Sequence, residues 1–229
     1  MAKHIGIVGG SAEGAALCYR TICAEAEAAM GEHMHPEVTM HTFALGDYMK
    51  RIEADSWDDV AYMMARSATK LADVGAEFAI CPDNTFHQVW QQAVDASPIP
   101  WLHIGKAVFE AAMEAGYRKV GLTGTAYLTG GPVYPSVFEG SPITLELPGE
   151  DDRQMMNQVI FERLVKGVFR DDDRQRYNAV FARFAERGCD AVIMGCTEIP
   201  LLMDGAETAL PTLDSTRLLA RAALQHANQ

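Results

Sequence analysis

Short runs of apolar residues alternate along the chain with longer amphipathic stretches. The apolar runs, which favour buried strands, lie at residues 4–10, 37–45, 77–81, 118–126, 142–147 and 189–196. The amphipathic stretches, which favour helices, lie at 12–30, 56–75, 106–116, 152–169 and 173–188. Continuous apolar strands that alternate with helices are typical of parallel sheets covered by helices on both faces. The pattern therefore predicts an α/β protein, with a short strand or crossover at 98–105 and a closing strand end and helix at 211–224.

Two sequence motifs occur twice. The stretch "KHIGIVGGSA" at 3–12 is matched by "RKVGLTGTA" at 118–126, and "VGAEFAICPD" at 74–83 is matched by "RGCDAVIMGC" at 187–196. The two matches have the same order and nearly the same spacing, which indicates an internal duplication. We expect two pseudo-symmetric three-layer α/β/α domains with parallel sheets, one formed by residues 1–100 plus 210–229 and the other by 101–209.

Polar loops follow four of the predicted strands, at 9–13, 82–87, 124–127 and 195–198. In open α/β sheets, ligands bind beyond the carboxyl ends of the strands. If the two domains face each other, the four loops converge on one interdomain cleft. The duplication then places Asp83 and Cys196 at equivalent strand ends, on opposite sides of a ligand.

Composition narrows the possible partners. A net charge of −12 argues against binding of nucleic acid, which needs clustered Lys and Arg. No apolar run reaches the roughly 18 residues of a membrane span, and the N-terminus leads directly into a strand, so we expect neither a membrane protein nor a signal peptide. Five cysteines with no CxxC pair predict reduced thiols in the cytoplasm and no metal site.

Two proton-transfer groups on opposite faces of a carbon are what a racemase needs. One group removes the α-proton and the other returns a proton from the far side, so Cys196 and Asp83 are the candidate catalytic pair. Donors at the strand-end loops are placed to hold an α-carboxylate and its developing charge; they are Asn84, Thr85, Thr125 and Thr197. Glu198 is a candidate partner of the substrate ammonium, or else an acid in the first turn of a helix that stabilises the helix dipole.

The same stretches resemble a known family. "MGCTEIPLL" is similar to the second catalytic motif of the aspartate/glutamate racemase family, "NTFH" to its "CNTxH" motif, "LTGTAY" to its "GT" loop and "PTLDST" to its closing motif. The resemblance runs from about residue 4 to residue 220 and is greatest to bacterial members that accept both aspartate and glutamate. It implies two pseudo-symmetric domains, an active site in the cleft between them, catalysis without a cofactor, and a homodimer.

The resemblance also assigns roles to individual residues. Cys196 matches the second catalytic cysteine, while the threonines and Asn84 named above match positions that bind the substrate backbone. Lys166 resembles the lysine that meets a side-chain carboxylate; the alternative is a solvated helix lysine. His87 matches the histidine of "NTxH", as a neighbour that tunes Asp83 or as a local packing residue. Ser11, in the first glycine loop, is a further candidate substrate contact.

The chain departs from the family at two places. The first catalytic cysteine is replaced by Asp83, and we interpret Cys81, two residues earlier, as a buried strand cysteine. The loop after the two glycines reads Ser11-Ala12-Glu13 where the family often has Met-Gly-Pro, which leaves the substrate open. We therefore expect a cofactor-independent racemase of aspartate or glutamate. The alternatives are a decarboxylase or isomerase that uses the Cys196 thiol alone, and a ligand-binding homologue that has lost catalysis.

Overall fold

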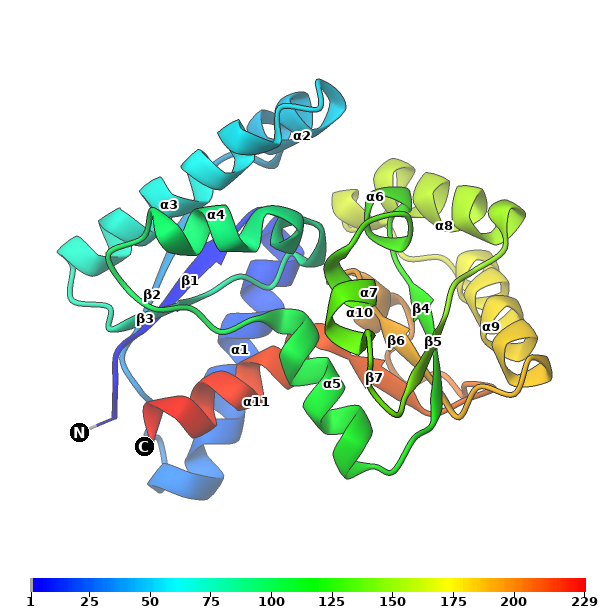
Figure 1. Ribbon diagram of the computed structural model, residues 1–229. Coiled ribbons are helices and arrows are strands. Elements are labelled where there is room, and N and C mark those ends of the chain that lie inside the picture. The colour runs from blue at the N-terminus through cyan, green and yellow to red at the C-terminus, as the bar shows by residue number, and fades with distance from the viewer. Residues whose placement is uncertain (1) are drawn as a thin grey trace. The chain divides into compact units, whose positions relative to one another are not determined.

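The computed structural model describes residues 2–229 and divides the chain into two compact units. The first unit comprises Met1–Ile104 and Thr216–Gln229, and the second comprises Gly105–Ser215. Each unit is an α/β structure built on its own parallel sheet (Figure 1).

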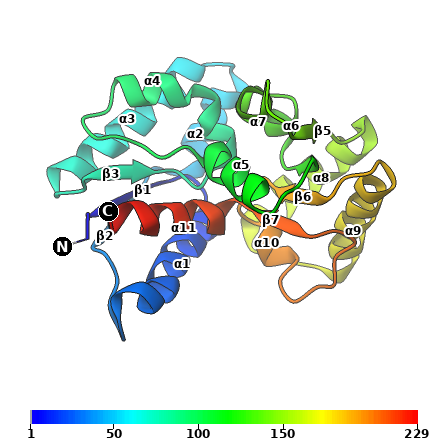
Figure 2. The same cartoon turned by 60° about the horizontal axis from the view of Figure 1, so that its bottom comes forward.

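The first unit has a three-stranded sheet in the order β2-β1-β3. Its strands are β1 (Ile5–Gly9), β2 (Val38–Thr42) and β3 (Phe78–Ile80), and all pairings are parallel. Its helices are α1 (Ala12–Met30), α2 (Leu45–Glu53), α3 (Trp57–Asp73), α4 (Trp90–Asp95) and α11 (Ser215–Ala227), with a 3-10 helix η1 at Asn84–Val89. Helices α1 and α11 lie on one face of the sheet and α3 on the other, as Figures 1 and 2 show. The core between the sheet and α1 and α11 contains Ile5, Ile7, Ile22, Phe78, Ile80, Leu219 and Ala223.

The second unit has a four-stranded parallel sheet in the order β5-β4-β6-β7. Its strands are β4 (Lys119–Thr123), β5 (Thr144–Glu146), β6 (Ala191–Met194) and β7 (Thr212–Asp214). Its helices are α5 (Ile104–Glu114), α6 (Ala126–Thr129), α7 (Val133–Phe138), α8 (Glu150–Glu162), α9 (Asp171–Glu186) and α10 (Ile199–Leu202), with a 3-10 helix η2 at Leu164–Lys166. Aromatic residues of α9 and apolar residues of α8 pack on β6 in a core that includes Met156, Ile160, Phe181, Phe184, Val192 and Met194.

The boundaries of the units differ from those predicted at two places. The chain returns to the first unit at residue 216 and not at 210, because β7 pairs with β6 and so completes the second sheet. The first crossing lies after Ile104, because Trp101 still forms an isolated parallel bridge with Ala79 of β3. The stretch at 98–105 is therefore a crossover that touches the first sheet before α5 begins.

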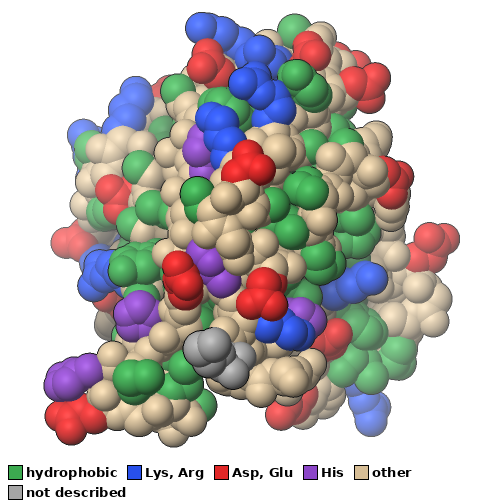
Figure 3. Space-filling view, turned by 90° about the vertical axis from the view of Figure 1, so that its left-hand side faces the viewer, with side chains coloured by type: hydrophobic (Ala, Val, Ile, Leu, Met, Phe, Trp, Pro, Cys, Tyr) green, Lys and Arg blue, Asp and Glu red, His purple; other side chains and the backbone are tan. Residues whose placement is uncertain are grey.

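Charged side chains of both signs are scattered among hydrophobic and other side chains on the face shown in Figure 3, with Lys and Arg gathered near its upper end, over the region of α2 and α3. Within residues 2–229, no helix has the length and apolar character needed to cross a membrane.

Candidate functional site

The loop after β3 places Asp83 against the loop between β1 and α1. Asp83 Oδ2 accepts a hydrogen bond from the Gly10 backbone N–H at 2.7 Å, and Oδ1 accepts one from the Ser11 N–H at 3.2 Å. Ser11 is also the N-cap of α1, where its Oγ accepts from the Gly14 N–H at 3.2 Å. Two residues predicted for the site, Asp83 and Ser11, are therefore joined directly within the first unit.

Gly10 makes this contact possible because the site has no room for a side chain. A Cβ at Gly10 would lie 2.5 Å from Phe86 Cε2 and 3.2 Å from Asp83 Cγ. Phe86 is itself held by stacking on Tyr48 of α2, with ring centroids 4.2 Å apart. The backbone of the β1–α1 loop is therefore packed tightly against the residues that follow β3.

Cys81 is a buried cysteine at the end of β3, as its position predicted. It has no exposed surface, and its thiol donates weakly to the Asp83 carbonyl at 3.9 Å. Burial, with the Asp83 carboxylate nearby, raises the pKa of the Cys81 thiol well above its usual value. A thiol that resists ionisation is a poor nucleophile and base, which leaves Asp83 as the candidate at this strand end.

The remaining residues of "NTFH" form the 3-10 helix η1. Asn84 is buried and its Nδ2 donates to the Pro82 carbonyl at 3.5 Å, whereas Thr85 is half-buried. His87 is buried, and its Nε2 lies 2.9 Å from the Cys81 carbonyl oxygen, so this nitrogen carries the proton. Burial, with a smaller effect of His103, lowers the pKa of His87 to about 3. A neutral imidazole that bonds the end of β3 fits the packing alternative for His87, and His103 contacts its ring edge-on.

The loop after β6 carries the second group of predicted residues. Cys196 Sγ donates to Glu198 Oε2 at 3.0 Å, and Thr197 Oγ1 donates to the same oxygen at 2.8 Å. All three side chains are buried, with Glu198 only 1% exposed. The other carboxyl oxygen of Glu198, Oε1, is buried and has no hydrogen-bond partner among the described residues. The side chain of Glu198 is thus engaged by its two neighbours and still has an acceptor to offer.

Two glycines allow β4 and β6 to bring their loops together. Gly195 N–H donates to the Thr123 carbonyl at 2.9 Å, and a Cβ at Gly195 would lie 2.6 Å from that oxygen and from Leu128 Cδ2. Gly124 has a φ of 152°, a conformation that favours glycine, and faces the Gly195 carbonyl. The close approach of the two strand ends fixes the backbone on which Cys196 is mounted.

Thr125 begins α6 as its N-cap, where its Oγ1 accepts from the Leu128 N–H at 3.1 Å. Asn157 of α8, which the sequence did not single out, accepts from the Ala126 N–H at 2.9 Å through its Oδ1. The signal for it was a pair of amides inside the otherwise apolar run "MMNQVI". Ser11 and Thr125 therefore have the same structural task, since each caps the helix that follows a first strand.

Lys166 lies at the end of η2 and is exposed, so it belongs to a 3-10 turn and not to a long helix. The turn is held at its base by Arg163, whose Nε and Nη2 donate to the buried carboxylate of Asp173 at 2.6 and 2.7 Å. Gly167 ends the turn with a left-handed φ of 69°. The fold presents the lysine to solvent on a well-anchored turn.

Two buried tyrosines that sequence reasoning missed accompany the two loops. Burial, and then the nearby Cys81, raise the pKa of Tyr48, which also feels Asp83. Burial, and then Cys196, raise the pKa of Tyr177 of α9, which also feels Asp173 and Glu198. Both phenols are therefore neutral at physiological pH. Aromatic residues inside amphipathic helices carry no sequence signal that separates them from ordinary core.

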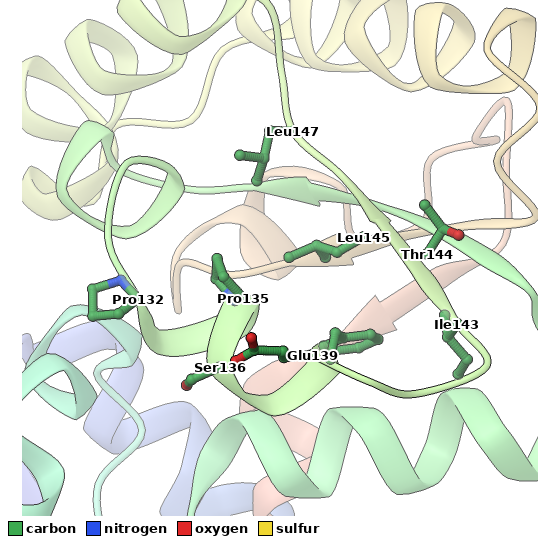
Figure 4. A pocket seen from close by; sticks show the side chains of 9 residues that line it. Pro132, Pro135, Ser136, Glu139, Ile143, Thr144, Leu145 and Leu147 are labelled. Atoms are coloured by element: carbon green, nitrogen blue, oxygen red, sulfur yellow. The ribbon is translucent and has the colours of Figure 1, made fainter.

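The groove in Figure 4 does not coincide with these loops. Across residues 2–229, no cluster of three or more His, Cys, Asp or Glu side chains is placed to hold a metal ion. The groove in Figure 4 lies between α7 and β5 and is lined mainly by apolar side chains, among them Pro135, Phe138, Leu145 and Leu147. None of its nine lining residues was predicted for the site.

The chain is similar to known proteins over nearly its whole length. The model of the Asp/Glu/hydantoin racemase family matches residues 5–223. The chain belongs to this family. It is 24% identical over 168 residues to the broad specificity amino-acid racemase RacX of Bacillus subtilis (strain 168), which covers 72% of this chain and 70% of that protein. Membership of the Asp/Glu/hydantoin racemase family supports amino-acid racemase activity on a small amino-acid substrate.

Solved structures share the fold over nearly the whole chain. A proposed Asp/Glu racemase from Yersinia pestis matches with a TM-score of 0.88 and 28% identity, covering 99% of this chain and all of that one. An aspartate racemase homologue from Pyrococcus horikoshii OT3 matches with a TM-score of 0.84 and 24% identity over the full length of both chains. Glutamate racemase from Francisella tularensis is more distant, with a TM-score of 0.70 and 14% identity over 96% of this chain and 79% of that one. The two-domain α/β architecture is thus that of the Asp/Glu racemases.

Proposed function

We propose that the protein is a cofactor-independent racemase of an acidic amino acid, aspartate or glutamate, in which Asp83 and Cys196 exchange protons with the substrate. The observation that carries the proposal is the buried Cys196–Thr197–Glu198 group at the end of β6 in a chain that the family model matches from residue 5 to 223. The names of the relatives, which include racemases of aspartate and of glutamate, support this substrate class.

In the proposed reaction, the Asp83 carboxylate takes the α-proton and the electron pair of the C–H bond passes into the substrate carboxylate as an enediolate. The Cys196 thiol then gives its proton to the opposite face of the α-carbon and becomes a thiolate. The other enantiomer reacts through the same steps in reverse. Hydroxyl and amide groups of Asn84, Thr85, Thr125 and Thr197 would stabilise the enediolate, because such preorganised donors act where charge develops.

Two charged residues complete the proposed substrate contacts. Glu198 Oε1 is buried with no partner among the described residues, and a substrate ammonium would satisfy it. The ammonium group of Lys166, exposed on its turn, would meet the side-chain carboxylate of the substrate. Ser11, at the start of α1, would add a contact near the positive end of that helix.

The test is incubation of the pure protein with each enantiomer of aspartate and glutamate in deuterated water. We expect α-deuteration and racemisation of at least one pair, and loss of both in Cys196→Ala. If all four acids keep their α-protons and their configuration, the proposed activity is wrong. Full activity in Cys196→Ala would overturn the assigned mechanism.

One observation favours an alternative function. Both carboxyl oxygens of Asp83 already accept backbone N–H groups, as expected of a positioning residue that leaves Cys196 as the one proton donor. A single thiol suits decarboxylation or isomerisation with protonation on one face. Release of carbon dioxide from a malonate-type acid, without α-exchange of aspartate or glutamate, would establish this alternative. Thermal stabilisation by these acids without turnover would indicate a binding protein instead.

The resemblance also supports a homodimer in the cytoplasm, which we propose on that basis alone. Light scattering of the purified protein measures the assembly directly, and a monomer at micromolar concentration would contradict it.

A further inference from the structure

We propose that the Asp83 carboxylate fastens the β1–α1 loop and releases it when the carboxyl group takes up a proton. Asp83 is then a positioning residue as well as the proposed proton acceptor. The consequence for the substrate rests on the proposed function, whereas the fastening itself does not. The inference also gives a physical reason for a carboxyl group at a position where the resemblance leads us to expect a thiol.

The geometry of the contact is that of an anion held by consecutive backbone donors. The N–H groups of Gly10 and Ser11 each bind a different oxygen of Asp83, at 2.7 and 3.2 Å. They belong to the loop that leads into the 19-residue helix α1, whose positive end favours a negative charge. A thiol has one sulfur and is a weak acceptor, so it cannot replace both bonds.

The same chain contains a second carboxylate of this kind. Asp190 Oδ2 accepts from the backbone N–H groups of Arg118 and Lys119, at 2.7 and 3.0 Å, at the start of β4. These two bonds are the main cause of a lowered pKa of Asp190. Asp190 lies outside both groups of predicted site residues. It is therefore a control for a carboxylate that binds two backbone N–H groups but takes no part in the proposed reaction.

Two titratable groups beside Asp83 stay neutral, and a nearby glutamate is exposed to water. Cys81, directly after β3, and Tyr48 on α2 are both close enough to Asp83 to interact with its charge, and the pKa of each is raised chiefly by burial, so both stay neutral. Glu13, in the first turn of α1, is exposed and therefore screened by water. The charge that the Gly10 and Ser11 amides meet is therefore set by the protonation of the Asp83 carboxyl group itself.

Proton transfer to Asp83 changes the strength of both loop contacts. When the α-proton moves from the substrate to a carboxyl oxygen, the negative charge of Asp83 disappears and the electron pair stays on the substrate. Hydrogen bonds to an ionised acceptor are about twice as strong as bonds between neutral groups. The loop that carries Ser11 is therefore held tightly before proton removal and loosely after it, which couples the chemical step to release of the loop.

The experiment measures amide hydrogen exchange in the full chain without substrate. Asp83→Asn imitates the protonated carboxyl group in size and charge, and we expect exchange at Gly10 and Ser11 to rise by about tenfold, as for loss of a charged hydrogen-bond acceptor. Asp190→Asn should raise exchange at Arg118 and Lys119 and leave Gly10 and Ser11 unchanged. Unchanged exchange at Gly10 and Ser11 in Asp83→Asn, with the expected rise in Asp190→Asn, would overturn the fastening.

A second variant protects the test against misfolding of the first. Gly10→Ala keeps Asp83 but places a Cβ 2.5 Å from Phe86, so it should displace the loop and raise exchange at the same two amides. If racemase activity is found, Asp83→Cys supplies an acid/base thiol but lacks the two acceptor oxygens. The fold-increase in KM should then be about ten times larger than the fold-decrease in kcat. An unchanged KM would overturn the link to the substrate, while the exchange result stands whether or not the protein is a racemase.

Discussion

At the scale of single residues, the decisive group is Glu198. The sequence left it as a partner of the substrate ammonium or as an acid at a helix start. In the structure its Oε2 accepts from Cys196 Sγ and Thr197 Oγ1, and α10 beyond it has only four residues. A carboxylate that accepts a hydrogen bond from a thiol orients that thiol, so these contacts fit the proposed role of Glu198 in the site.

We expect Glu198→Gln to lower kcat/KM about 100-fold, the lower range for loss of a group that assists proton transfer. The neutral amide lacks the negative charge that attracts a substrate ammonium. It also accepts a weaker hydrogen bond from the Cys196 thiol. Steady-state kinetics against Glu207→Gln, an exposed glutamate of the same unit, measure the effect. A Glu198→Gln enzyme with at least half of the original kcat/KM would contradict this role.

At the scale of elements, the site depends on how closely strand ends approach each other. The sheet order β5-β4-β6-β7 puts β4 beside β6, so their loops meet through Gly124 and Gly195. In the first unit, the sheet order β2-β1-β3 likewise puts β1 beside β3, so the backbone of Gly10 contacts the side chain of Asp83. The parallel pairing of the first and the third strand, repeated in each unit, is what joins the polar loops in pairs.

We predict opposite effects of the same glycine substitution at two positions. Gly195→Ala should destabilise the protein by about 1–3 kcal/mol, because its Cβ meets a backbone oxygen at 2.6 Å that cannot move away cheaply. Gly46→Ala in α2, where nothing lies within 4 Å of the new Cβ, should stabilise it by about 0.5–1 kcal/mol. Urea denaturation measures both. Equal effects of the two substitutions would show that the strand ends are not tightly packed.

At the scale of the whole molecule, buried neutral groups set how folding stability depends on pH. His87 has a pKa of about 3 in the folded protein, against 6.5 for the free side chain. Below pH 6.5 the unfolded chain therefore binds a proton at this residue that the folded protein does not bind until about pH 3. Stability is lost as the pH falls through this window. The lowered pKa values of Glu146, from its bond to Lys119, and of Asp190 act in the same direction.

We expect His87→Gln to lose less stability than the original protein between pH 7 and pH 4.5. The difference should be about 2 kcal/mol, since one pKa unit corresponds to about 1.4 kcal/mol. Urea denaturation at both pH values measures it, with His33→Gln as an exposed control. The same pH dependence in His87→Gln and in the original protein would mean that His87 is not buried neutral.

Much of the fold could be predicted because its signals are local. Continuous apolar runs between amphipathic stretches indicated parallel strands between helices, and strands and helices lie where these runs are. The repeated motif correctly indicated two α/β units. The chain returns to the first unit at residue 216 and not near 210, because a short strand such as Thr212–Asp214 is placed by the neighbour it pairs with and not by its own composition.

The sequence by itself determined the two polar strand-end motifs and the resemblance to a racemase family, in which Asp83 stands where a thiol is expected, since each is a property of residues close together in the chain. Only the tertiary structure decided what those residues touch. Asp83 binds two backbone amides more than 70 positions earlier, and Tyr177 of α9 comes near Cys196 of the β6–α10 loop. Such contacts depend on strand order and helix packing, and no local pattern encodes them. From the sequence, the first residue of "DNTFH" is a carboxyl group where a thiol is expected. Only the fold shows that this carboxyl group binds the backbone of the β1–α1 loop.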